Sequence, residues 1–100
     1  MGAQKSICKS ELSIEKFISE IVRRKESIEI IMQISNNKSI ITSKDILDGI
    51  YITDGRYIEI KGLESLKAEI KMDGMKYRKF YGGSYVLYQK NTTVLLKLLK

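Results

Sequence analysis

The chain contains no proline, no histidine and no tryptophan among its 100 residues, and it has one cysteine, Cys8. Without histidine, a Ser-His-Asp triad and a histidine-ligated zinc site are both excluded. A single cysteine forms no internal disulfide, so we expect a cytoplasmic, intracellular protein. No apolar run approaches the roughly 20 residues that cross a bilayer and no signal peptide is visible, so we expect no membrane span. Catalytic chemistry would therefore come from carboxylates, lysines, tyrosines or the backbone.

Basic residues are concentrated in the second part of the chain. Residues 1–60 hold nine basic and nine acidic side chains, whereas residues 61–100 hold nine basic and three acidic ones. The whole net charge of +6 therefore lies in the second part. Such asymmetry indicates a polyanionic partner, with ordinary surface lysine as the plain alternative.

The apolar spacing predicts a helix over Ser10–Lys25. Its apolar residues recur at intervals of three and four and form one stripe, and Ser10 or Ser13 is suited to cap its start. We expect residues 1–9 to be a flexible N-terminus and residues 10–100 to form a single domain. Gly2 and Ser6 match the short signal for N-myristoylation.

The remaining pattern is richer in strand signals. Ser27–Ser35 is β-branched and predicts a strand, and residues 38–45 a weaker strand or a loop. Alternating runs around Asp54-Gly55 predict a β-hairpin over residues 49–61. For residues 63–80 we favour a second, basic helix, and a hairpin about Asp73-Gly74 stays open as the alternative. The expected fold class is α+β, with a central, mostly antiparallel or mixed sheet flanked by the two helices.

The predicted hairpin brings three charged side chains to one face. A two-residue turn would place Asp48 opposite Lys61, with Glu59 on the diagonal about 7–8 Å away. Two carboxylates at that spacing suit a divalent cation, which lowers the pKa of a bound water and stabilises charge on a phosphate. Asp45 is an alternative ligand to Asp48, and a plain ion pair between Asp48 and Lys61 is the simpler interpretation.

On these residues the sequence resembles the PD-(D/E)XK nuclease superfamily, and within it the small archaeal and viral Holliday junction resolvases. The resemblance rests on Asp48, on Glu59-Ile60-Lys61 and on the element order over about residues 10–90. It implies a restriction-endonuclease-like fold, Mg²⁺ or Mn²⁺ held by Asp48 and Glu59, and catalytic roles for Glu15, Asp48, Glu59 and Lys61. It also implies a homodimer that acts on branched or duplex DNA.

Two weaker similarities point to other nucleases. LDGIYITDG (Leu47–Gly55) is similar to the LAGLIDADG motif of homing endonucleases, in which the last acidic residue, here Asp54, binds metal. YGGSYVLYQKNTTVLLK (residues 81–97) resembles part of the C-terminal domain of archaeal tRNA-splicing endonucleases, without its histidine.

Aromatic and basic residues alternate over residues 76–90, a pattern that suits stacking on bases and contact with phosphates. The candidate nucleic-acid-binding residues are Lys67, Lys71, Lys76, Tyr77, Arg78 and Lys79. The sequence therefore predicts a magnesium- or manganese-dependent endonuclease that cleaves DNA, with RNA as a second possible substrate. The alternative is a small non-enzymatic module that binds nucleic acid or protein, such as a viral or plasmid-encoded inhibitor.

Overall fold

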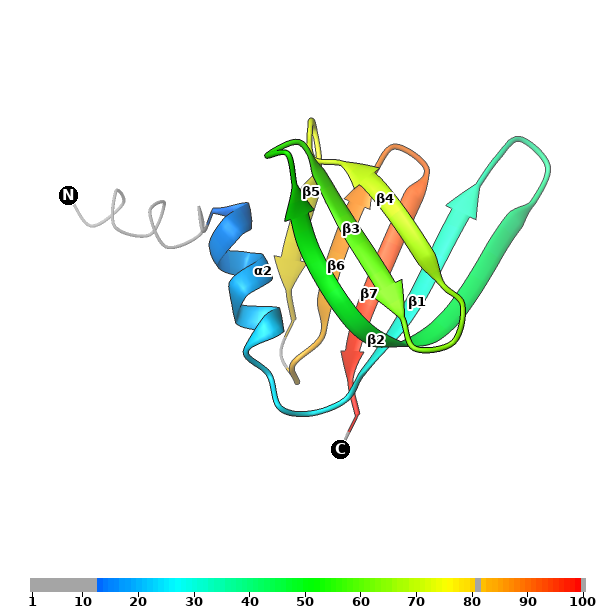
Figure 1. The fold of residues 1–100 in the computed structure, drawn as a ribbon. Coiled ribbons are helices and arrows are strands. Elements are labelled where there is room, and N and C mark those ends of the chain that lie inside the picture. Colours follow the sequence, from blue (N-terminus) through cyan, green and yellow to red (C-terminus); the bar gives the residue numbers. More distant parts are fainter. Residues whose placement is uncertain (1–12, 81, 100) are drawn as a thin grey trace.

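The computed structural model describes residues 13–80 and 82–99, which form one helix and one seven-stranded antiparallel sheet (Figure 1). The spatial order of the strands is β4-β3-β2-β1-β7-β6-β5. The elements are α2 (Ile14–Val22), β1 (Ile28–Ser35), β2 (Ile40–Thr53), β3 (Tyr57–Gly62), β4 (Lys67–Lys71), β5 (Lys76–Lys79), β6 (Tyr85–Gln89) and β7 (Thr92–Leu98).

The predicted fold class is wrong, because the second helix does not exist. Residues 63–66 form a loop, and β4 and β5 occupy the rest of the expected helix. The alternation of Ala68, Ile70 and Met72 outweighs the helical spacing, because β4 pairs along its whole length with β3 and buries Ile70. The alternative hairpin is also wrong, since β4 and β5 follow one another in the chain but lie at opposite edges of the sheet.

The N-terminal helix is confirmed over a shorter range than predicted. It begins after Ser13, whose hydroxyl accepts a hydrogen bond from the backbone N–H of Lys16 at 3.2 Å. Its buried residues are Phe17, Ile18 and Ile21. The predicted flexible segment 1–9, the start at Ser10 and the match at Gly2 lie outside the described residues.

The central hairpin is confirmed with a different register. Asp54 and Gly55 both have positive φ, at 56° and 66°, as the turn chemistry predicts. The ladder starts at the pair Thr53 and Tyr57, however, so the loop has three residues and every pair from there to Gly49 and Lys61 is shifted by one. Ile50 consequently lies opposite Ile60 rather than Glu59, and both side chains are buried.

A β-bulge in β2 bends the sheet. The register shifts between Leu47 and Gly49, so Asp48 is an additional residue without a partner in β3. Before the bulge Asp45 faces the core, and after it Ile50 does so. An extra residue reverses the alternation of faces, so inward side chains have odd numbers before the bulge and even numbers after it.

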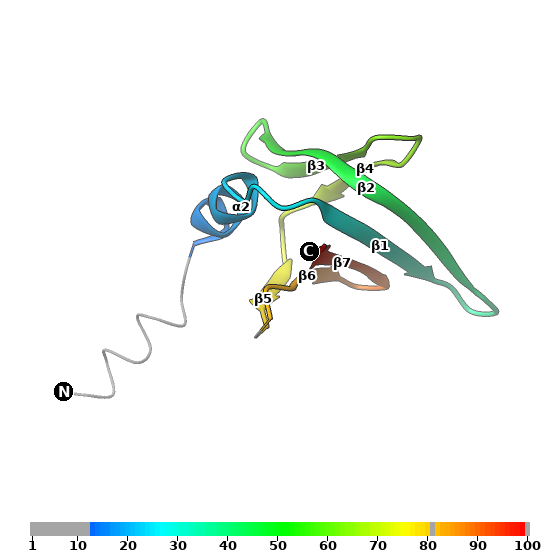
Figure 2. The same cartoon turned by 90° about the horizontal axis from the view of Figure 1, so that it is seen from below.

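The bent sheet wraps around a single core. Figure 2 shows β2, β3 and β4 folded over β1, β7 and β6, with α2 beside the core where the strands leave it uncovered. A link of residues 72–75 joins the two edge strands, and it spans less than about 18 Å. The helix closes the core through Phe17, whose ring lies 4.9 Å from that of Tyr77 and 5.5 Å from that of Tyr85.

Candidate nucleic-acid interface

The residues predicted to hold a metal are only partly brought together. Glu59 and Lys61 share the outer face of β3, as predicted. The predicted pairing of Asp48 with Lys61 is wrong, because the three-residue loop shifts the ladder by one residue and places Gly49 opposite Lys61. The bulge then leaves Asp48 without a partner in β3. The Lys61 ammonium instead lies over the ring of Tyr51, 6.0 Å from its centroid.

Other carboxylates do not complete the predicted metal site. Glu59 lies opposite Glu69 on β4, and Glu15 is exposed on the first turn of α2. Within residues 13–80 and 82–99, no group of three acidic or cysteine side chains is placed to hold a metal ion. Roles for Asp48, Glu59, Lys61 and Glu15 in metal-dependent cleavage therefore stay predictions.

Asp45, the alternative metal ligand, has a structural role. Its side chain is buried, and its two oxygens accept hydrogen bonds from the backbone N–H groups of Ile46, Glu64, Ser65 and Leu66 at 2.7–3.1 Å. The donors, led by Leu66, lower the pKa of Asp45 from 3.8 to about 2. Both oxygens are thus occupied, and the carboxylate holds the loop between β3 and β4 against β2.

The other half of the sheet, from β5 to the first half of β2, has an uncovered outer surface. The outward side chains of β5, β6, β7, β1 and the first half of β2 form a surface that no described element covers, here called the open sheet face. None of its side chains is buried, whereas inward side chains of β1, β6 and β7 lie in the buried core. The strand registers arrange it in three rows, Phe80–Ser84–Lys97–Glu29–Ile46, Arg78–Val86–Leu95–Ile31–Lys44 and Lys76–Tyr88–Thr93–Gln33–Thr42.

The open sheet face combines cations with accessible rings. It carries four basic side chains and one carboxylate, namely Lys44, Lys76, Arg78, Lys97 and Glu29. Phe80 is 44% exposed and Tyr88 is 36% exposed. The Arg78 guanidinium lies 6.0 Å from the centroid of the Phe80 ring, which is a cation–π distance. Between the charges runs an apolar strip of Val86, Leu95 and Ile31, so the surface offers phosphate contacts around a stacking area.

The candidate nucleic-acid-binding residues separate into two groups. Lys76 and Arg78 belong to the open sheet face. Lys67 and Lys71 lie on β4 at the other edge, where Glu69 stands between them on the same face. Tyr77 faces the core and packs on Phe17, so it is not a surface ring.

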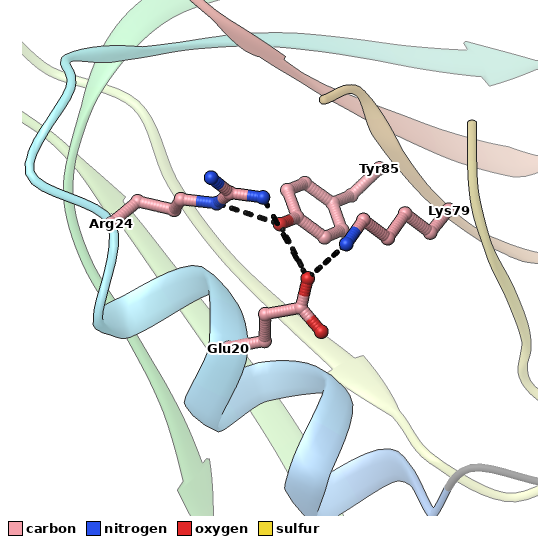
Figure 3. Close-up of polar contacts among 4 residues, drawn as sticks. All are labelled: Glu20, Arg24, Lys79 and Tyr85. Carbon is pink, nitrogen blue, oxygen red and sulfur yellow. Dashed lines mark hydrogen bonds and ion pairs between the residues drawn. The ribbon is translucent and has the colours of Figure 1, made fainter. Parts of the chain in front are cut away.

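Lys79 joins a polar cluster that connects α2 to the sheet (Figure 3). The Glu20 carboxylate accepts hydrogen bonds from the Lys79 ammonium at 2.5 Å and from the Tyr85 hydroxyl at 3.0 Å. The same hydroxyl accepts a hydrogen bond from Nε of Arg24 at 2.9 Å. These contacts, led by the one from Lys79, lower the pKa of Glu20. The hydrogen bond to the Tyr85 hydroxyl raises the pKa of Arg24, so Glu20 and Arg24 are both charged at neutral pH.

Sequence reasoning missed four residues of this region. Arg24, Lys44, Phe80 and Lys97 are not among the residues that the sequence predicts to bind nucleic acid, although Phe80 lies within the aromatic and basic segment 76–90. Strand alternation would have found Lys97, because Val94, Leu96 and Leu98 mark the opposite face. Lys44 required the length of β2, and Arg24 required the packing of the helix.

Neither family models, nor curated proteins, nor solved structures gave a match to this chain. In the part of the chain that the structure describes, no helix has the length and apolar character needed to cross a membrane. The assignment of function therefore depends on the site itself.

Proposed function

We propose that this chain is a non-enzymatic nucleic-acid-binding protein whose open sheet face binds single strands. One observation carries the proposal: an uncovered antiparallel sheet face has four cations against one carboxylate and two accessible rings. Basic side chains that neutralise phosphates supply affinity, and rings on a sheet stack with bases of any sequence.

Single strands fit this surface better than duplexes do. In a duplex the bases stack on one another, so the rings of Phe80 and Tyr88 and the apolar strip between the cations would have no partner. A single strand offers its bases to these groups and its phosphates to the lysines and Arg78. The proposal covers DNA and RNA alike, because neither phosphate contacts nor base stacking requires the 2′-hydroxyl.

The experiment measures the binding of fluorescent DNA and RNA strands of about 12 nucleotides, single and duplex, by anisotropy at low salt. The variant Lys76→Gln/Arg78→Gln removes two charges from the open sheet face. The matched control Lys67→Gln/Lys71→Gln removes two charges from the opposite edge. We expect the first to weaken single-strand binding about tenfold and the control to stay within about twofold.

Two results would overturn the proposal. One is an absence of binding by the unaltered chain at low salt, and the other is an equal loss in both double variants. The same strands, incubated with Mg²⁺ or Mn²⁺, test the predicted endonuclease. Cleavage abolished by Asp48→Ala and Glu59→Ala would establish a metal-dependent enzyme and contradict a purely binding role. The homodimer also stays a prediction, which light scattering of the purified chain tests.

A further inference from the structure

A strongly basic pocket lies at one corner of the open sheet face. It has a volume of about 610 Å³ and is lined by Arg24, Arg78, Lys79, Phe80, Gly82 and Gly83. Two elements supply its three cations, since Arg24 follows α2 while Arg78 and Lys79 end β5. Among the described residues, no carboxylate lines the pocket, although Glu20 contacts Lys79 and Arg24 from beside it. We call it the corner pocket.

Two cations of the corner pocket, Arg24 and Arg78, have N–H donors that no described group accepts. Nε of Arg24 is used by Tyr85, but the nearer terminal nitrogen is 3.8 Å from Glu20, which is too long for a hydrogen bond. Among the described residues, the Arg78 guanidinium has only its contact with the Phe80 ring. Two guanidinium forks facing one pocket suit the oxygens of a phosphate, because each fork offers parallel N–H donors.

The other walls fit a nucleotide as well. Gly82 and Gly83 have φ values of 90° and 89°, which side chains rarely adopt, so the backbone itself forms this wall. A Cβ built on Gly82 would have no described heavy atom within 4 Å, apart from those of its two chain neighbours. There is therefore open space beside the backbone at Gly82. The exposed Phe80 ring stands beside the cations and offers a surface on which a base can stack.

We propose that the corner pocket binds the terminal phosphate of a strand that lies on the open sheet face, with the terminal base on Phe80. This inference rests on the proposed function. At pH 7 a phosphate monoester carries about −1.5 to −2 charges, more than the single charge of an internal diester. Three cations in one pocket therefore favour the chain end over the interior of the strand.

The test compares one labelled single strand with a 5′-phosphate, a 3′-phosphate or hydroxyls at both ends. We expect one phosphorylated end to bind about tenfold more tightly than the hydroxyl strand. Arg24→Gln should reduce this preference to about twofold and weaken binding of the hydroxyl strand by less than about twofold, because the four cations of the open sheet face remain. The matched control is Arg23→Gln, which removes the same charge one residue earlier and should keep the preference.

The outcomes separate the two proposals. Equal affinity for all three strands would overturn the terminal-phosphate site and leave the open sheet face as the binding surface. No binding of any strand would overturn the proposed function itself. Glu20→Gln supplies a second variant if Arg24→Gln fails to fold. It leaves Lys79 and Arg24 without their carboxylate, so the preference for the phosphorylated end should rise, and an unchanged or smaller preference would contradict the site.

Discussion

Two carboxylates with lowered pKa values anchor two different corners of this fold. Asp45 is held by backbone N–H groups and is buried beside the β3–β4 loop. Glu20 is held by the side chains of Lys79, Tyr85 and Arg24, and its side chain is 27% exposed. Backbone donors fixed by the fold have no other partner available, whereas cationic side chains at the surface can exchange one anion for another.

This contrast predicts different effects for the loss of Asp45 and the loss of Glu20. Around Asp45 the charge is satisfied within the fold, so we expect its loss to lower stability and leave nucleic-acid binding alone. Around Glu20 two of the three partners also line the corner pocket, so we expect its loss to change binding more than stability. The same difference distinguishes the two edges of the sheet, because Glu69 lies between the two lysines of β4 while β5 carries no carboxylate.

The largest effect is expected from Asp45→Ala. Removing the carboxylate leaves the N–H groups of residues 64–66 without their acceptor, which costs more than the hydrogen bonds themselves contribute. We expect the melting temperature to fall by about 10 °C, measured by circular dichroism. Asp48→Ala, three residues along the same strand but exposed, is the control and should change it by less than about 2 °C. Equal changes in the two variants would contradict the structural role of Asp45.

A methyl group at Gly62 tests the same corner from the opposite side. A Cβ there would lie 2.2 Å from Oδ2 of Asp45, an atom that its hydrogen bonds hold in place. Gly49→Ala is the matched control, since its Cβ would meet the hydroxyl of Tyr51 at 2.1 Å, and that side chain is 48% exposed and can turn away. We expect a loss of about 5 °C or more for Gly62→Ala and little change for Gly49→Ala. The reverse order would show that the carboxylate is not fixed.

Acid should weaken the fold through Asp45. Because the pKa is about 2 in the folded chain against 3.8 as its ordinary value, the unfolded chain binds the proton more readily. The contribution is therefore complete above about pH 4 and is lost as the pH falls towards 2. Urea unfolding between pH 2 and 6 measures it, and Asp45→Asn should flatten this part of the curve. A variant curve as steep as that of the unaltered chain would assign the acid response to other groups.

The smallest change in stability is expected from Glu20→Gln. The amide keeps an acceptor for Tyr85 and loses the ion pair with Lys79, so the melting temperature should fall by no more than about 3 °C. Affinity for a single strand with a terminal phosphate should rise about threefold, because two cations of the corner pocket lose their internal partner. Weaker binding of that strand would contradict the corner pocket as its site.

Local patterns predicted local structure well. The stripe on α2, the cap at Ser13 and the position of the turn at Asp54-Gly55 were correct, because neighbouring residues decide each of them. The length of that turn was wrong, since the loop has three residues rather than two. The region 63–80 was wrong because its state depends on pairing with β3 and on hydrogen bonds to Asp45, which lies far away in the sequence.

The candidate site was predictable to a similar degree. Charge and aromatic patterning pointed to Lys76 and Arg78, which lie on the open sheet face. The proposed Asp48–Lys61 pair failed because the loop after Thr53 has three residues rather than two, which shifts the register by one. Asp48 itself is the additional residue of the bulge and has no partner in β3. Arg24 reaches the corner pocket only through the packing of α2 on β6.

The most direct test of the binding surface is a chemical-shift titration of the isotopically labelled chain with a single strand. The account predicts that the largest shifts fall on the methyl groups of Ile31, Val86 and Leu95, between the cations of the open sheet face. Largest shifts around Tyr51, Glu59 and Lys61 on the other half of the sheet would contradict it.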